Sequence, residues 1–329
     1  MAFKICVIGC GNMSYSIHGP AIKRYEDLNE DVRFTACCDL DEGRALAFKE
    51  RFGLDHFYTD IDNMLDTERP AAVCLISPVD KTAELTCKIF EKGYPLILEK
   101  PPGMNVEETR RMIEAGGNIP NQVAFNRRYM PLVLKAMELI DTWGGTGCIL
   151  DINYRMLRFK RVDADFSTTA IHGIDLVKHV AQADYRHIDF KYRDLPQHGK
   201  TVANFHLNCE MENGIFAHLD FLPVTGINTE RMEINTTQGL LVLHLPIWAG
   251  CYDAPGQLIH YANNEIVLTV SGEDLSGSSE DFMLAGFYDE NARFFDDVRN
   301  GKKPEGDIAT GLQSVEVAHY ISRRQLVYR

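Results

Sequence analysis

The sequence predicts an α/β fold, with a doubly wound parallel sheet in its first part and an α+β region with a largely antiparallel open sheet in its second part. Three observations predict this fold. Short apolar runs alternate with helical segments up to residue 142, a glycine-rich turn follows the first run, and strand-like runs with few helices between them begin near residue 147. Because 329 residues exceed what one core usually holds, we expect two domains, over residues 1–123 and 124–329.

The first part contains short apolar runs that have the composition of buried strands, at 3–8, 32–38, 71–76, 95–98 and 122–125. Segments with helical spacing accompany them, at 20–28, 41–52, 81–92, 105–115 and 131–142. Continuous apolar strands separated by amphipathic helices are typical of a parallel sheet that is covered on both faces. In such sheets ligands bind beyond the carboxyl ends of the strands, so we look for the site there.

The second part has strand-like runs at 148–156, 202–211, 215–221, 231–235, 240–245 and 266–270, and helices are expected near 281–299 and 309–323. Short turns between successive strands predict mainly antiparallel pairing. Trp248, between the fifth and sixth of these strands, is interpreted as an apolar loop anchor, with a sugar-stacking face as the alternative.

Composition excludes several classes of protein. The formal charge of −13 argues against a nucleic-acid partner, which would need a basic face. Nine cysteines without a C-x-x-C pair, and no H-E-x-x-H segment, predict reduced thiols and no metal site. No apolar run has the length of a membrane span, and the chain starts directly with a strand-like run, so we expect a cytoplasmic protein.

A glycine-rich turn follows the first strand, with the sequence G-C-G-N-M-S at 9–14. It resembles the dinucleotide-binding fingerprint of a Rossmann sheet, G-x-G-x-x-G, with serine at the last position. Gly9 would form the tight turn, Gly11 would let a pyrophosphate approach the backbone, and Ser14 is small enough for close packing of helix on strand.

Asp39 ends the second strand, where a carboxylate can accept hydrogen bonds from both ribose hydroxyls and would repel a 2′-phosphate. NAD is therefore favoured over NADP as the cofactor. The alternative is that Asp39 only caps the helix that starts near Asp41. Arg44 lies close enough in the sequence to weaken the exclusion of NADP.

The segment L-I-L-E-K-P-P-G at 96–103 ends another strand in a carboxylate and an ammonium group. The two prolines fix the backbone behind Lys100 and would hold this lysine in one place. A lysine beside a nicotinamide can donate to a substrate hydroxyl or take part in its proton transfer. The alternative is that Glu99 and Lys100 are an ordinary surface pair.

With these motifs in hand, the whole chain resembles the Gfo/Idh/MocA family of NAD(P)-dependent oxidoreductases. The motifs that carry the resemblance are G-C-G-N-M at 9–13, I-S-P at 76–78, E-K-P at 99–101, V-A-F-N-R-R-Y at 123–129, H-G-I-D at 172–175, F-F at 294–295, and the spacing of Gly301, Pro304, Asp307 and Ser314. The resemblance implies that Lys100 and His172 are catalytic.

The resemblance also implies the binding residues. The expected cofactor contacts are Gly9, Gly11, Asn12, Met13, Asp39, Ser77, Pro78, Glu99, Lys100, Asn126 and Arg128. The expected substrate contacts are Lys100, Arg155, Thr168, His172 and Asp175. Thr168 stands where many members have an aspartate, and Val79 and Thr82 stand where members often have asparagine and histidine. The segment at 165–169 also replaces the glycines that usually precede the H-x-x-D helix.

Two features of the second part can be argued from the residues themselves. His172 and Asp175 are three apart on an expected helix and share one face, so the carboxylate could orient the imidazole. His179, farther along, is interpreted as structural or solvent-facing. In the basic stretch at 154–161, Arg155 and Arg158 fall on opposite faces of a regular strand, so they cannot form a single clamp. One of them could pair with a carboxylate or phosphate of the substrate, and the alternatives are a solvated strand end or salt bridges between subunits.

The leading hypothesis is an NAD-dependent dehydrogenase that acts on a secondary hydroxyl of a sugar, cyclitol or related polyol. The active site would lie between the nucleotide crevice and one face of the second sheet, and the resemblance implies a homodimer or homotetramer that pairs through this sheet. The second hypothesis, favoured by Thr168, is a regulator that senses NAD or a sugar without turnover. The third is reduction of a C=N bond or a tetrapyrrole on the same scaffold.

Overall fold

The computed structural model describes residues 2–163, 165–247 and 253–329, so Trp248 lies outside the described residues. The chain forms two compact units, and each is described by itself. The first contains Met1–Phe125 and Phe287–Val315, and the second contains Asn126–Gly286 and Glu316–Arg329.

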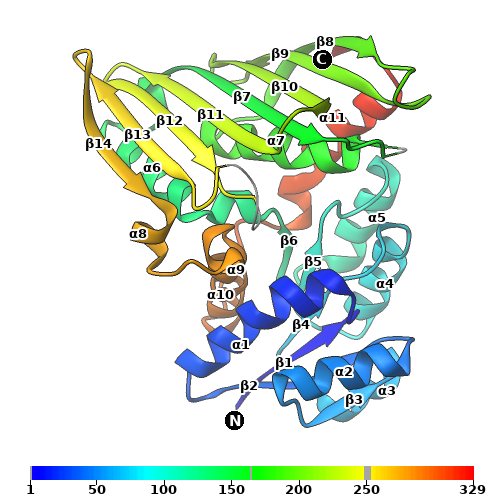
Figure 1. Ribbon diagram of the computed structural model, residues 1–329. Coiled ribbons are helices and arrows are strands. Elements are labelled where there is room, and N and C mark those ends of the chain that lie inside the picture. The colour runs from blue at the N-terminus through cyan, green and yellow to red at the C-terminus, as the bar shows by residue number, and fades with distance from the viewer. Residues whose placement is uncertain (1, 164, 248–252) are drawn as a thin grey trace. The chain divides into compact units, whose positions relative to one another are not determined.

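The first unit is built on a six-stranded parallel sheet (Figure 1). Its strands are β1 (Phe3–Ile8), β2 (Val32–Cys38), β3 (His56–Tyr58), β4 (Ala72–Leu75), β5 (Leu96–Glu99) and β6 (Asn121–Ala124). Their order, β3-β2-β1-β4-β5-β6, is that of a Rossmann sheet, which places the switch of direction between β1 and β4. The doubly wound parallel sheet predicted from the sequence is therefore confirmed.

Helices of the first unit begin at residues that suit helix starts. They are α1 (Gly19–Leu28), α2 (Glu42–Phe52), α3 (Ile61–Glu68), α4 (Val79–Glu91), α5 (Val106–Gly116) and α10 (Phe287–Arg299), with a short π-helix, η1 (Ser14–His18), before α1. The side chains of Asp41, Asp60 and Asn105 accept hydrogen bonds from backbone N–H groups of the first turns of α2, α3 and α5. Such caps satisfy donors that have no partner inside the helix.

The structure differs from the predicted elements of this unit in two ways. The short strand β3 and helix α3 were not expected, because β3 has three partly exposed residues and carries little apolar pattern. The segment Phe287–Val315 also returns to the first unit instead of the second. Phe294 and Phe295 of α10 belong to the same apolar core as Ile5 of β1, and such a long-range contact leaves no periodic signal in the sequence.

The second unit contains a nine-stranded sheet of order β14-β13-β12-β11-β7-β10-β9-β8-β15 (Figure 1). Its strands are β7 (Ile149–Phe159), β8 (Tyr185–Asp194), β9 (Ala203–Met211), β10 (Phe216–Thr225), β11 (Thr229–Thr236), β12 (Gly239–Leu245), β13 (Gln257–Ala262), β14 (Glu265–Ser271) and β15 (Val327–Tyr328). All pairs are antiparallel except β7 with β10, so the predicted, largely antiparallel sheet is confirmed. Strands β8 and β13 were not predicted, because polar residues interrupt their apolar runs.

Helices of the second unit connect and cover its strands. They are η2 (Asn126–Tyr129), α6 (Pro131–Thr142), η3 (Gly145–Cys148), α7 (Ser167–Ala181), α8 (Gly272–Ser276) and α9 (Asp281–Leu284), and α11 (Ile308–Ser322) runs through the point where the two units divide. Helix α7 lies against β7 and β10, and the residues of these strands alternate between buried and more exposed (Figure 1). Among the described residues, no helix has both the length and the apolar character needed to cross a bilayer.

Candidate active site

The glycine-rich turn lies where strands β1, β2 and β4 end together. The backbone N–H of Gly9 donates to the carbonyl oxygen of Cys38, and that of Ile76 donates to the carbonyl oxygen of Ile8, each at 2.8 Å. Gly9 has a φ of +92°, and a Cβ at this position would stand 2.0 Å from the carbonyl oxygen of Ile76. Both the backbone angle and the close approach of the neighbouring strand require glycine here.

The rest of the turn leaves room beside the backbone. A Cβ on Gly11 would meet no heavy atom within 4 Å, while Ser14 is buried and its hydroxyl donates to the carbonyl oxygen of Gly9. Ser14 thus closes the turn from inside, as a small residue at the third position of the fingerprint should. Asn12 and Met13 are solvent-exposed on the same turn. The open side at Gly11 fits a dinucleotide that approaches the backbone.

Asp39, at the end of β2, is tied to this turn. One carboxylate oxygen accepts a hydrogen bond from the backbone N–H of Cys10 at 2.8 Å, and the other accepts from the backbone N–H of Asp41 at 2.9 Å. The side chain that caps α2 is Asp41, not Asp39. The capping alternative is thus wrong, and the carboxylate of Asp39 keeps lone pairs for a ribose. Arg44 lies 3.2 Å from Asp39, with more than half of its side chain exposed.

Ser77 and Pro78 follow β4, next to the glycine turn. Pro78 precedes the first residue of α4, and the Ser77 hydroxyl lies 3.0 Å from that of Thr82, which is buried one turn into the helix. The hydroxyl of Thr82 therefore fixes the orientation of the Ser77 hydroxyl. This arrangement places a hydroxyl at the carboxyl end of the strand beside β1.

Glu99, at the end of β5, is held by a histidine that the sequence analysis missed. His18, at the end of η1, is buried and its Nε2 lies 2.9 Å from Oε1 of Glu99, while its Nδ1 lies 3.3 Å from Nδ2 of Asn291 in α10. Since the Asn291 amide donates to Nδ1, the proton of a neutral imidazole stands on Nε2 and is donated to Glu99. Burial acts to raise the pKa of Glu99, but the hydrogen bond from His18 and the charge of Lys100 contribute to lowering it overall.

Lys100, the residue after Glu99, is fixed through its backbone. Its backbone N–H donates to Oε2 of Glu99 at 3.0 Å, so the carboxylate that binds His18 also fixes the backbone of the lysine. The bond between Lys100 and Pro101 is cis, and the Lys100 side chain is partly exposed. Lys100 therefore stands at the carboxyl end of β5, and its backbone is fixed by the hydrogen bond to the Glu99 carboxylate. Glu99 differs from a plain surface carboxylate because its side chain, which is only 12% exposed, is bonded to the buried His18.

His172, in the second unit, is buried on α7. The next residue, Gly173, packs on β7 so closely that a Cβ there would stand 2.1 Å from Cε1 of Tyr154. Glycine is thus needed at this point of the helix, and it sets the distance of His172 from the sheet. The hydroxyl of Tyr185 donates to the carbonyl oxygen of Ile174 at 2.7 Å and fixes the same turn from β8.

Asp175 does not stand alone on the face that it shares with His172. The Arg128 guanidinium, in η2, donates to both carboxylate oxygens of Asp175, at 2.7 and 2.5 Å, and both groups are buried. Asn126, two residues earlier, donates from its side-chain amide to the carbonyl oxygen of Ala285 at 2.8 Å. Arg128 and Asp175, predicted as a cofactor and a substrate contact, are thus brought together as a pair that ties η2 to α7.

Of the remaining predicted substrate contacts, Thr168 stands one turn before His172 on α7, whereas Arg155 lies on another face of the unit. The hydroxyl of Thr168, at the start of α7, donates to the carbonyl oxygen of Asp165 at 3.0 Å. Arg155 is exposed on the face of β7 opposite to Tyr154, and therefore opposite to α7, whereas Arg158 is fully buried. The expectation that these arginines lie on opposite faces is confirmed. We leave Arg155 out of the proposed site because it does not share the face of His172.

Arg158 belongs to a buried ion network below α7. Glu230 of β11 accepts hydrogen bonds from Arg127 at 2.6 Å, from Arg158, and from the hydroxyl of Tyr154 at 2.8 Å. Because Tyr154 also touches Gly173, this network supports the turn that carries His172. This network was not predictable from the sequence, since Glu230 stands far from its partners in the chain.

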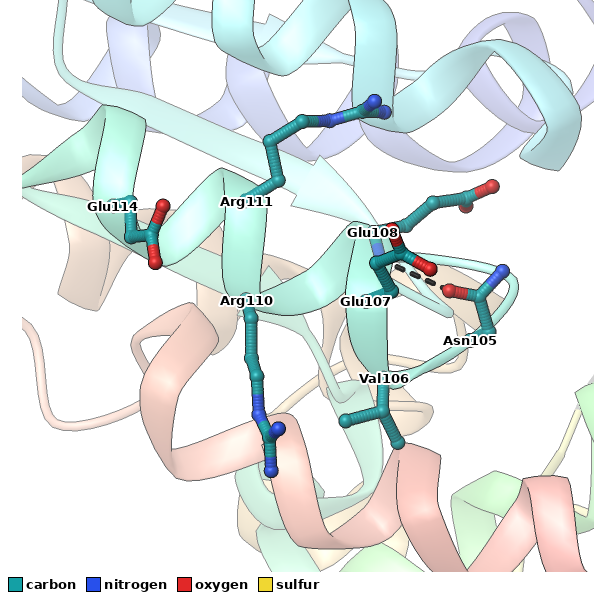
Figure 2. Close-up of a pocket in the computed structure, with 7 residues that line it drawn as sticks. All are labelled: Asn105, Val106, Glu107, Glu108, Arg110, Arg111 and Glu114. Carbon is teal, nitrogen blue, oxygen red and sulfur yellow. Dashed lines mark hydrogen bonds between the residues drawn. The ribbon is translucent and has the colours of Figure 1, made fainter.

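A surface pocket in the first unit contains none of the predicted site residues. Its lining residues are Asn105, Val106, Glu107, Glu108, Arg110, Arg111 and Glu114, all from α5 and its cap (Figure 2). Figure 2 shows the side chains of Arg110 and Arg111 pointing away from each other on this helix. The pocket offers no group suited to hydride transfer, and we do not assign the site to it.

Comparison with known proteins agrees with this geometry. Residues 3–124 match the model of the oxidoreductase family with an NAD-binding Rossmann fold, GFO_IDH_MocA. D-glucoside 3-dehydrogenase of Escherichia coli is 27% identical over 123 residues, which are 37% of this chain and 34% of that protein. Inositol 2-dehydrogenase of Klebsiella pneumoniae is 25% identical over 201 residues, which are 58% of each protein. The chain thus spans about a third to three fifths of the length of these curated relatives.

Among solved structures, levoglucosan dehydrogenase in complex with NADH is similar in fold, with a TM-score of 0.81 and 18% identity over 99% of this chain and 98% of that one. The first unit is an NAD-binding Rossmann domain, as its glycine turn and Asp39 predicted. The match to the Gfo/Idh/MocA family covers residues 3–124, and over this part of the chain the resemblance inferred from the motifs is confirmed.

Proposed function

We propose that the protein is an NAD-dependent oxidoreductase that transfers a hydride between the nicotinamide and a secondary hydroxyl, or the corresponding ketone, of a sugar, cyclitol or sugar derivative. The observation that carries the proposal is the anchoring of Lys100 at the end of β5 through Glu99 and the buried His18. The family match and the activities named for the sugar and inositol dehydrogenases support the same reaction class.

In the proposed reaction, Lys100 donates a hydrogen bond to the substrate oxygen and stabilises the negative charge that develops on it. His172 accepts the hydroxyl proton during oxidation and returns it during reduction. Proton transfer by a positioned side chain contributes about 10²–10⁴ in rate. NAD, when bound, supplies the hydride chemistry. Gly9, Gly11, Asn12, Met13, Ser77, Pro78 and Asp39 would hold it.

The Arg128–Asp175 pair has a positioning role in this proposal. It fixes the helix face of His172 instead of binding substrate directly, and its buried bidentate geometry supports that role. Asn126, bonded to the backbone of Ala285, would act in the same way.

The test is the appearance of reduced-nicotinamide absorbance with NAD, and then with NADP, over neutral sugars, cyclitols, sugar acids, sugar phosphates and nucleotide sugars. Lys100→Met and His172→Asn should each lower kcat at least a hundredfold with the active substrate. Lys92→Met is the matched control, because Lys92 pairs only with the surface carboxylates of Asp62 and Asp66 in the same domain. Equal kcat in Lys100→Met and in the control would refute the assignment of Lys100.

A second function is favoured by one observation. The Thr168 hydroxyl is bonded to the backbone of its own helix start, so it does not replace the aspartate of many family members as an acid or base. This supports a regulator that binds NAD or a sugar without turnover. Calorimetric binding of NAD combined with silence across the whole substrate panel would favour the regulator, whereas turnover of any substrate would exclude it.

We further propose a cytoplasmic homodimer or homotetramer that pairs through the nine-stranded sheet. In the described part of β10, residues of the face opposite to α7 include Phe216, which is 60% exposed although apolar. Burial of such side chains in a second copy would stabilise the assembly. Light scattering of the eluted protein after size exclusion measures the mass, and a mass of 37 kDa, that of one chain, would refute the assembly.

A further inference from the structure

Two histidines and an aspartate lie together on the sheet of the second unit, on the face opposite to α7. His206 is on β9, and His218 and Asp220 are on β10 (Figure 1). Asp220 stands directly across from His206 in the strand register, and His218 is two residues before it on the same face. From each residue one ligand atom can be chosen so that all three lie within 4.8 Å of one another.

The hydrogen-bond geometry of this cluster suits a cation. Nδ1 of His206 lies 2.6 Å and Nε2 of His218 lies 3.0 Å from the same oxygen of Asp220. In a tetrahedral zinc site, ligand atoms at bond lengths near 2.0–2.1 Å stand about 3.3 Å apart. Small rotations of the three side chains would therefore open the cluster to a metal ion, without any change in the strands.

A second observation concerns the other ring nitrogen of His218. Its Nδ1 lies 2.7 Å from Oδ1 of Asn208, which faces it across the β9–β10 pair. The imidazole of His218 thus stands between the amide oxygen of Asn208 and the carboxylate of Asp220. A metal-binding histidine typically donates its other N–H to an oxygen in this way, which fixes the ring and its tautomer.

We propose that His206, His218 and Asp220 form a binding site for a divalent first-row transition metal of the zinc type. Imidazole and carboxylate are suitable ligands for such ions, and three protein ligands leave positions for water. The ligands come from two strands, which is why no metal-ligand spacing was found along the sequence. The site is separate from the proposed reaction, because it lies across the sheet from His172.

Two positively charged side chains near Asp220 and His206 oppose the binding of a metal ion by electrostatic repulsion. The Arg155 guanidinium lies 3.4 Å from the second oxygen of Asp220, and Lys191 of β8 stands across from His206 in the register. Both leave the oxygen shared by the two imidazoles available. The carboxylate side chain is 16% exposed and the imidazoles are 35% and 41% exposed, so an ion can reach them in the single chain.

The experiment is calorimetric titration of the untagged full-length protein with Zn²⁺, repeated with Co²⁺ while visible absorbance is recorded. We expect one ion per chain and cobalt bands of a site with nitrogen and oxygen ligands. His206→Asn and His218→Asn should each weaken binding at least tenfold. His260→Asn, which removes an imidazole from β13 with no carboxylate in hydrogen-bond contact, should leave it unchanged.

Circular dichroism verifies that each variant is folded, so loss of binding is not loss of structure. The proposal is overturned if the protein binds no Zn²⁺, or if both histidine variants bind it as tightly as the parent protein. Neither result bears on the dehydrogenase, because the titration contains no substrate and no NAD. Conversely, the protein could bind one Zn²⁺ through these residues and show no turnover across the substrate panel. That result would refute the proposed reaction and leave this site standing.

Discussion

Replacing Glu230 by glutamine tests whether the buried ion network holds the second unit together. Glu230 is fully buried and accepts hydrogen bonds from Arg127, Arg158 and Tyr154. The substitution keeps the size of the side chain but removes the charge. It leaves two buried guanidinium groups without their common anion, which is the most costly way to break a buried ion pair.

The magnitude follows from the pKa of Glu230. Burial alone would raise this pKa, but the charges of Arg127 and then Arg158, together with their hydrogen bonds, lower it from 4.5 to about 2. Since each tenfold change in proton affinity corresponds to about 1.4 kcal/mol, the folded state favours the ionised over the protonated form of Glu230 by about 3 kcal/mol more than the unfolded chain does. Because the pKa is lower in the folded state, this stability is present above pH 4.5 and is lost as the pH falls toward 2.

The assay is urea unfolding followed by circular dichroism between pH 7 and pH 3. We expect Glu230→Gln to lower the free energy of unfolding by about 3–5 kcal/mol at pH 7, and the difference from the parent protein should shrink below pH 4.5. Glu138→Gln, in an exposed surface pair of the same unit, is the control and should change little. A difference that stays constant from pH 7 to pH 3 would refute the role of the Glu230 charge.

Three further predictions concern the site. Gly9→Ala should lower the thermal midpoint and the NAD affinity, because it forces a side chain into a φ of +92° and against a neighbouring carbonyl oxygen; unchanged calorimetric binding would contradict this. Asp39→Ser should lower kcat/KM for NAD about tenfold or more and raise the preference for NADP, since the charge that repels a 2′-phosphate is gone; an unchanged ratio would argue against contact with the ribose. Gly173→Ala should reduce kcat because its Cβ would overlap Tyr154, whereas Gly147→Ala, which has open space, should not.

The parallel sheet was predictable because its strands are buried on both faces and are therefore continuous apolar runs. Strands β1, β2 and β5 carry these runs, and each ends in the polar or glycine residue that a crevice needs. The parts that were missed lack this property. Strand β3 is a short, partly exposed edge, and β8 and β13 mix polar residues into their apolar faces.

For the site, the sequence shows which residue types stand at the ends of strands, but not how they are joined. His172 and Asp175 share a helix face, as expected, yet the partner of Asp175 is Arg128 from a segment that lies before β7. The spacing of an aspartate three residues after a histidine is equally compatible with orienting the imidazole or binding another element. Only the position of η2 decides between them.

His18 shows the same limit most clearly. In the sequence it is four residues beyond the glycine turn, 81 positions from Glu99 and 273 from Asn291, and nothing local connects the three. Yet a buried carboxylate at the end of β5 needs a donor, because an unpaired charge in the interior is strongly unfavourable. His18 would have been found by asking which side chain, from an element near the end of β5, could donate to Glu99. Strands β1 and β5 both flank β4, and the helical segment that follows β1 carries the buried His18.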